Sequence, residues 1–218
     1  MRLYMVLIAL AFIIAVFGSD ATQVNEVSEV NEDAIVNILG QQGYKIAPFT
    51  LQGSLKTGGD VVSFNGTLQE IDAQARRIKR DFTWEDFHSE KPTEADTIQP
   101  RWRPVENKTL CHVQHLKSGP KSALEAAQMW LMNYSFWFQV SAQTCERVWC
   151  ELGGDLWLCN DNLGWSEFYS VEMKNLTDSI LSNEDCADRD DPNKMQGQVF
   201  QLERNYNVLF NGNDGLCS

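Results

Sequence analysis

The chain has 218 residues, of which 43% are hydrophobic, and its 18 basic and 30 acidic side chains give a net charge of −12. This composition is close to the globular average, which excludes a wholly disordered chain and leaves enough apolar material for a packed core. The negative charge argues against a nucleic-acid-binding protein, which needs a basic face, and against adsorption to an anionic membrane.

Residues 1–18 match a secretory signal peptide. Met1 and Arg2 precede an apolar run that ends at Phe17 and is short for a membrane span. The small residues that follow predict cleavage after Gly18 or after Ala21. A membrane anchor is the competing interpretation. We expect a secreted, extracellular protein without stable membrane insertion.

Residues 22–80 contain no cysteine. Their hydrophobic pattern predicts helices over 31–43 and 69–78. It also predicts strands over 44–51 and 61–68.

The paired cations Lys79 and Arg80 close this segment. Such a pair suits a processing protease whose acidic subsites bind two adjacent cations, so residues 22–80 are predicted to be a prosegment or an N-terminal extension. The competing interpretation is that these cations end the 69–78 helix, where they complement its dipole. The proline-containing residues 81–106 are expected to form an extended polar leader to a cysteine-rich domain over 107–218.

All six cysteines lie in the second half of the chain, at Cys111, Cys145, Cys150, Cys159, Cys186 and Cys217. An even number behind a signal peptide predicts three disulfides formed in an oxidising compartment. Zinc binding is the alternative, but the paired C-x-x-C spacing of a zinc site is absent. Six cysteines allow fifteen connectivities, and the sequence alone does not choose among them.

Four N-x-[S/T] tripeptides are candidate N-glycosylation sites, as expected of a secreted glycoprotein: Asn65, Asn107, Asn133 and Asn175. Asn133 falls within a strongly apolar predicted helix, so we expect it to be too buried for use.

The cysteine-rich half reads as strand, helix, hairpin, helix, hairpin. A strand over 110–114 precedes a helix over 122–137, for which Ser122 and Glu125 form a capping-box pattern. Hairpins are predicted over 146–160 and 199–210, the first turning at Gly153 and Gly154. A helix over 167–181, capped by Ser166, lies between them. This order indicates an α+β fold, a small disulfide-stapled antiparallel sheet with two helices packed on one face.

The chain lacks the nucleophile elbow, the H-E-x-x-H zinc motif and the phosphate-binding loop. His112 and His115 lie near Cys111, but the spacing falls on a strand and its exit, so we predict neither a metal nor a cofactor. The acidic stretch 188–193 fails the calcium-loop template. Five tryptophans are candidates for a sugar-stacking platform, although core packing is the favoured interpretation of most: Trp130, Trp137, Trp149, Trp157 and Trp165.

Three stretches resemble small cysteine-rich secreted proteins of filamentous fungi: CERVWCELGGDLWLCNDN (145–162), QGQVFQLERNYNVLF (196–210) and FNGTLQEIDAQ (64–74). These proteins are distantly similar to the smut-fungus killer toxins and to secreted necrosis-inducing effectors. The resemblance implies a killer-toxin-like α/β sandwich. It also implies the pairing of Cys111 with Cys186, Cys145 with Cys159 and Cys150 with Cys217. The functional surface of the toxins is basic, so channel inhibition is not transferred to any residue of this acidic chain.

The leading expectation is a non-enzymatic secreted fungal effector or toxin-like virulence protein that acts on host or competitor cells as a monomer. Its partner would be a protein of those cells or a cell-wall polysaccharide, and not a nucleic acid. The alternatives are a cell-wall carbohydrate-binding module, which an exposed row of tryptophans would favour, and a small secreted hydrolase, which needs two close carboxylates or a Cys/His pair.

Overall fold

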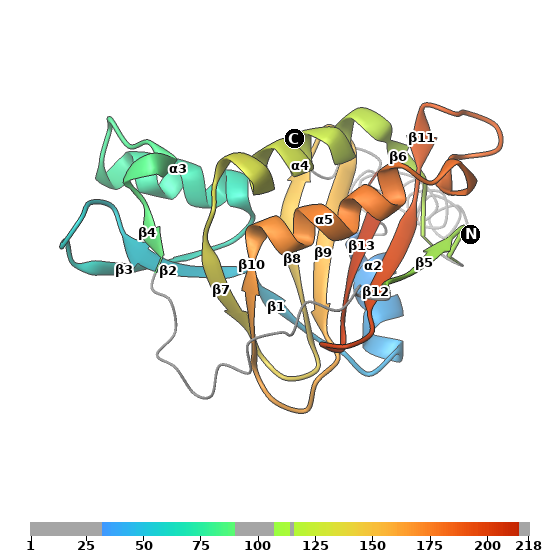
Figure 1. The fold of residues 1–218 in the computed structure, drawn as a ribbon, viewed down its shortest axis with the longest axis horizontal. Coiled ribbons are helices and arrows are strands. Elements are labelled where there is room, and N and C mark those ends of the chain that lie inside the picture. The colour runs from blue at the N-terminus through green and yellow to red at the C-terminus, as the bar shows by residue number, and fades with distance from the viewer. Residues whose placement is uncertain (1–31, 90–106, 114–115, 214–218) are drawn as a thin grey trace, which may run out of the picture.

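The computed structural model describes residues 32–89, 107–113 and 116–213. A six-stranded sheet forms its centre (Figure 1). In spatial order the strands are β1 (Lys45–Pro48), β8 (Thr144–Glu151), β9 (Gly154–Asn160), β13 (Tyr206–Gly212), β12 (Gly197–Gln201) and β5 (Asn107–Cys111). Neighbouring strands are antiparallel except β1, which pairs in parallel with β8.

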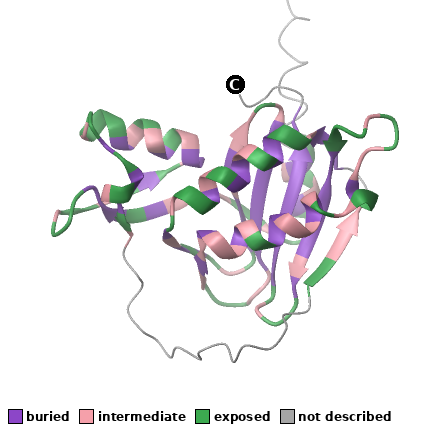
Figure 2. Ribbon diagram, turned by 45° about the horizontal axis from the view of Figure 1, so that its top comes forward, coloured by how far each residue is buried: buried purple, intermediate pink, exposed green. Residues whose placement is uncertain are grey.

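Both faces of this sheet are covered. Helices α4 (Lys121–Asn133) and α5 (Ser170–Leu181) lie side by side over one face, and α2 (Glu32–Gln41) packs on the other. Successive side chains of a strand point to opposite faces of the sheet, so neighbouring residues join different cores. Leu158 packs in the larger core under α4 and α5, whereas Trp157 packs in a smaller core with α2. Strand β9 is therefore buried along its whole length, as Figure 2 shows for the centre of the sheet.

The N-terminal half contributes a second, three-stranded sheet. It consists of β3 (Val61–Asn65), β2 (Thr50–Ser54) and β4 (His88–Ser89), and α3 (Leu68–Ile78) packs beside it. Helix α3 begins at Leu68, one residue before its predicted start, because Thr67 and Glu70 form a capping box. The remaining elements are short: β6 (Gly119–Pro120) with β11 (Lys194–Met195), β7 (Trp137–Val140) with β10 (Ser166–Tyr169), and the 3₁₀ turns η1 (Trp84–Asp86) and η2 (Glu184–Cys186).

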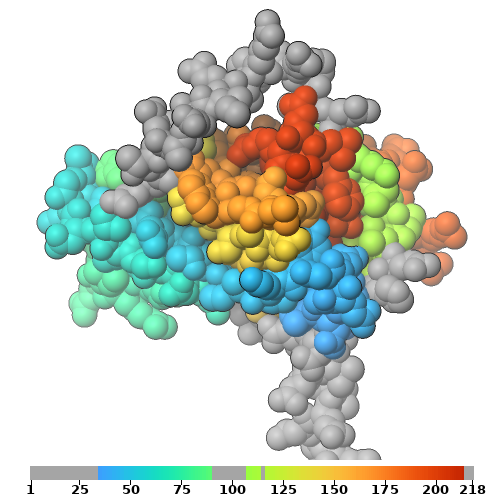
Figure 3. Space-filling model, turned by 90° about the horizontal axis from the view of Figure 1, so that it is seen from below, coloured from blue at the N-terminus to red at the C-terminus, as the bar shows by residue number. Residues whose placement is uncertain are grey.

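The N-terminal and cysteine-rich halves share one core. Phe49 and Phe64 belong to the same buried cluster as Leu124 and Phe210, and the two halves lie against each other over a broad front (Figure 3). The dibasic pair at Lys79 and Arg80 therefore does not mark a boundary between separately packed units.

The α+β class and the two helices packed on one face are confirmed, whereas the purely antiparallel sheet and the polar leader need correction. The sheet is mixed, because a strand of the supposed prosegment joins its edge in parallel. A third helix, α2, covers its second face. Residues 81–89 are not a polar leader, because Phe82, Trp84 and Phe87 are buried. Trp84 stacks on Tyr134 with ring centroids 4.9 Å apart. Residues 1–31 and 90–106 lie outside the described part of the chain.

Both long helices of the cysteine-rich half are shorter than predicted. Helix α4 ends at Asn133 because Trp137–Val140 pairs as strand β7 with β10. Strand β10 takes residues 167–169 from the predicted second helix together with its predicted cap Ser166, so α5 begins at Ser170. Ser122 is not an N-cap, since α4 begins one residue earlier, where the backbone N–H of Lys121 donates to the Asn193 carbonyl.

The β8–β9 turn also differs in detail from its prediction. Leu152 and Gly153 carry the positive φ angles, rather than the two glycines. Gly154 is required for packing instead, because a Cβ there would lie 2.9 Å from the Ala123 side chain. None of the described helices has the length and apolar character needed to cross a membrane.

Two disulfides are described, Cys111–Cys186 between β5 and η2 and Cys145–Cys159 across β8 and β9. These are two of the three pairs implied by the resemblance. Cys150 is disulfide-bonded, and Cys217 lies outside the described residues.

The two described disulfides should stabilise the fold unequally. They close loops of 75 and 14 residues, which corresponds to about 4 and about 3 kcal/mol of lost chain entropy in the unfolded state. We predict that Cys111→Ser/Cys186→Ser lowers the free energy of unfolding more than Cys145→Ser/Cys159→Ser, measured by urea denaturation. Equal or reversed losses would contradict this account.

Cleavage after Arg80 should leave a two-chain particle. Residues up to 80 contain no cysteine, but they pack in the common core and pair through β1. We predict that a chain cut there elutes as one species in gel filtration and separates into two bands on non-reducing denaturing electrophoresis. Lys79→Ala/Arg80→Ala is the uncut control. Elution of a free N-terminal fragment would refute the prediction.

Candidate functional site

A cavity of about 280 Å³ opens where β2, β7 and β8 meet the loop before β10. Its size is near the lower end of the range for ligand pockets. Its described lining combines aromatic side chains with neutral polar ones and one carboxyl: Thr50, Gln52, Trp137, Phe138, Gln139, Ser141, Glu146 and Trp165.

Strand β7 supplies the centre of the lining. Its alternation turns Phe138 into the core, where the ring makes an edge contact with Phe49 at 5.0 Å between centroids. Trp137 and Gln139 lie on the opposite face. Tyr169 of β10 stacks on Trp137 with ring centroids 4.9 Å apart. Because Tyr169 covers one face of the indole, the ring is held in place while it lines the cavity.

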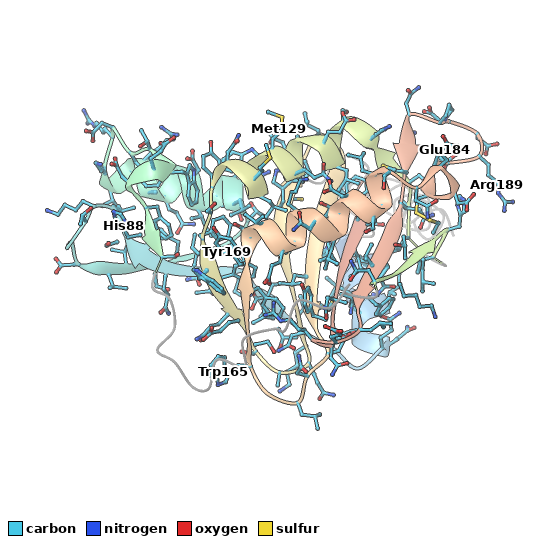
Figure 4. The ribbon with its side chains drawn as sticks, viewed as in Figure 1. His88, Met129, Trp165, Tyr169, Glu184 and Arg189 are labelled. Atoms are coloured by element: carbon cyan, nitrogen blue, oxygen red, sulfur yellow. A yellow bond between two sulfur atoms is a disulfide. The ribbon has the colours of Figure 1, made fainter. Side chains whose placement is uncertain are left out.

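Trp165 comes from the loop between β9 and β10 and is 53% exposed. In Figure 4, Tyr169 lies at one end of β10 and Trp165 lies beyond the other end. Asn160 holds this loop, since its fully buried side-chain amide donates to the carbonyls of Val140, Ser141 and Gly164 at 2.9–3.0 Å. The amide of one side chain thus ties the end of β7 to the residue before Trp165.

The neighbours of Asn160 anchor the same loop. Asn162 donates to the Asn160 side-chain oxygen at 2.8 Å and to the Arg204 carbonyl at 2.8 Å. Asp161 accepts hydrogen bonds from the Tyr44 hydroxyl and from Asn207. Each residue of the Cys-Asn-Asp-Asn stretch therefore has a structural partner, and together they position one wall of the cavity.

Glu146 is the single carboxyl among the described lining residues. It is 4% exposed, and its Oε2 has no hydrogen-bond partner in the described structure. Burial raises the pKa of Glu146 to about 8, and a hydrogen bond from the backbone N–H of Thr50 opposes this shift to a smaller extent. At neutral pH the cavity therefore contains mostly a neutral carboxylic acid.

This arrangement is suited to binding an uncharged polar molecule. The aromatic rings offer flat apolar surfaces, while the amides, the hydroxyls and the carboxyl offer hydrogen-bond donors and acceptors. The described residues contain no group of three His, Cys, Asp or Glu side chains that could hold a metal ion. His88 is exposed, with Nε2 2.9 Å from the Thr57 hydroxyl, and His115 lies outside the described residues.

The five candidate tryptophans fall into two groups, those that pack in or against the core and those that line the cavity. Trp149 and Trp157 are buried, and Trp130 packs against the core. Only Trp137 and Trp165 of the five candidates line the cavity.

The acidic stretch 188–193 uses a carboxylate for its own turn, because Asp188 accepts hydrogen bonds from the backbone N–H groups of Asp190 and Asp191.

None of the modification sites is itself a lining residue, but Asn65 lies beside the cavity, since its side-chain oxygen accepts a hydrogen bond from the hydroxyl of the lining residue Thr50 at 2.8 Å. Lys79 pairs with Asp86 at 2.5 Å, and Arg80 is exposed. All four glycosylation candidates are exposed, including Asn133, for which the expected burial is wrong because α4 ends there. Asn65, Asn107 and Asn175 are exposed on β3, β5 and α5.

The sequence reasoning missed Glu146 and the polar residues around it, Thr50, Gln52, Gln139 and Ser141. One signal was present. Glu146 alternates with Val148 on β8, so a charged residue occupies a position of the strand that faces the larger core. Gln52 and Gln139 carry no comparable signal, because exposed glutamines are ordinary on strands.

Comparisons with known proteins found no matching family model, no matching curated protein and no matching solved structure.

Asn160 should be the residue on which the loop depends most. Asn160→Ala removes the donor to three carbonyls, and we predict a loss of about 1–3 kcal/mol in the free energy of unfolding. Asn37→Ala on the exposed side of α2 is the matched control and should change it little. A tryptophan fluorescence spectrum and melting temperature equal to those of the wild type would contradict the assigned role.

Proposed function

We propose that the protein is a non-enzymatic extracellular binding protein whose cavity takes a neutral carbohydrate of a cell wall. The observation that carries the proposal is the composition of the cavity. Trp137 and Trp165 accompany two glutamines and a buried carboxyl that lacks a partner in the described structure.

A carbohydrate can contact both the aromatic and the hydrogen-bonding side chains of this lining. The C–H faces of a sugar ring pack on aromatic side chains, and its hydroxyls exchange hydrogen bonds with amides and carboxyls. Trp137 is held by Tyr169, and Trp165 by the loop that Asn160 anchors. A binding surface that is ordered before the ligand arrives loses less entropy on binding.

The same cavity gives less support to a hydrolase. Hydrolysis of a glycoside by the common mechanism needs two carboxyls that flank the scissile bond. The described lining offers Glu146 alone. Cys111, Cys145, Cys150, Cys159 and Cys186 are disulfide-bonded and do not supply a thiol nucleophile.

The effector role implied by the sequence resemblance stays a proposal as well. In this proposal the protein is secreted by a filamentous fungus and acts on host or competitor cells, and wall carbohydrate is the partner through which it engages them. The signal-peptide pattern of residues 1–18 and the disulfides support an extracellular location.

Trp165 provides the direct test. We predict that Trp165→Ala binds N-acetylchitotetraose or laminaritetraose about tenfold more weakly than the wild type in calorimetry, since contact with an aromatic ring is worth roughly 1 kcal/mol or more. Leu163→Ala is the matched control, because Leu163 is 87% exposed in the same loop and does not line the cavity. Failure of the wild type to bind either oligosaccharide, or equal losses in both variants, would reject the proposal.

A further inference from the structure

Resting on the proposed function, the geometry points to Glu146 as the specificity-determining residue of the cavity. We propose that its protonated carboxyl donates a hydrogen bond to an oxygen of an uncharged sugar, and that the cavity rejects sugars bearing a carboxylate.

The buried Oε2 of Glu146 is placed to meet a partner on a bound molecule. A buried polar atom without a hydrogen bond is unfavourable, and such atoms are uncommon in native proteins. Glu146 is 4% exposed and lines the cavity, and its Oε2 is one of the few partnerless buried atoms in the described structure. An oxygen acceptor on a bound molecule would satisfy the O–H of the protonated acid.

Within the described residues, no cation pairs with Glu146. Its cross-strand neighbours are Ala47 on β1 and Leu158 on β9. The guanidinium of Arg147 lies 5.7 Å from the centre of the Trp157 ring, which belongs to the core on the other face of the sheet.

Of the other ionisable groups on the surrounding strands, Glu167 of β10 lies nearest the cavity, since it is half-buried and pairs with the lining residue Gln139, while the rest are distant in register or exposed. Lys45 is exposed at the start of β1, and Asp155 lies opposite Cys150 on β9. Glu151 ends β8 opposite Gly154, and His88 of β4 contacts Thr57. Within the described residues no salt bridge involves Glu146.

Charge selection follows from this environment. With no cation beside Glu146 among the described residues, a carboxylate on the ligand would be buried unpaired, and this is costly even while Glu146 is neutral. Once Glu146 ionises, it no longer donates a hydrogen bond, and it repels any acceptor oxygen placed against it. Binding of a neutral sugar should therefore weaken as the pH rises through the pKa of Glu146.

The test compares the wild type, Glu146→Gln and Glu167→Gln of the secreted protein by calorimetry. The probes are N-acetylchitotetraose and laminaritetraose, which are neutral, and tetragalacturonic acid, which is anionic. We expect the wild type to bind a neutral probe at pH 6 and about tenfold more weakly at pH 9, about one unit above the pKa of about 8. Glu146→Gln keeps a neutral donor and should bind equally at both pH values, whereas Glu167→Gln should follow the wild type.

The outcomes separate this inference from the proposed function. Binding of a neutral probe with the same pH profile in the wild type and Glu146→Gln overturns the role of Glu146 and leaves carbohydrate binding in place. Binding of tetragalacturonic acid at pH 6 as tightly as a neutral probe has the same consequence. If no neutral probe binds the wild type at pH 6, the proposed function fails and the role of Glu146 fails with it.

A ligand-free measurement tests the neutral carboxyl separately. The raised pKa means that the folded state holds the Glu146 proton more tightly than the unfolded chain. The stability of the wild type relative to Glu146→Gln should thus be highest below pH 4.5 and fall as the pH rises to about 8. A stability difference that stays constant with pH contradicts a neutral carboxyl in the folded protein.

Discussion

The β8–β9 hairpin is the element on which the rest of the structure depends. Its outer edges pair with β1 and β13, and the Cys145–Cys159 disulfide crosses its two strands. Because successive side chains point to opposite faces, the hairpin contributes to the large core with one set and to the small core with the other. It also positions the cavity, since Glu146 lies on β8 and Asn160 ends β9.

The cavity and the surface of the molecule differ in charge character. The chain carries a net charge of −12, yet the one carboxyl in the described lining is shielded from water and stays largely protonated at neutral pH. A strongly negative protein repels anions at long range, and a buried acid with no cation beside it among the described residues disfavours them at short range. Both effects favour an uncharged ligand.

Short-range signals explain which elements the sequence predicts well. The hydrophobic periodicity of 69–78 predicts α3 to within one residue at its start, and the strand pattern of 199–210 predicts the β12–β13 hairpin. The predicted helix over 122–137 is wrong at its end, because its aromatic residues fit a helix stripe and a strand equally well. Pairing with β10 decides between them, and that partner lies well beyond the predicted helix in the sequence.

The sequence by itself determined the α+β class, most of the elements and the candidate tryptophans, because periodicity, caps and turn residues act over a few neighbouring positions. Only the tertiary structure decided that the segment before Lys79 completes the central sheet and that Trp137 and Trp165 face a cavity. It also decided that burial raises the pKa of Glu146, because the cavity lining around this carboxyl is assembled from distant parts of the chain.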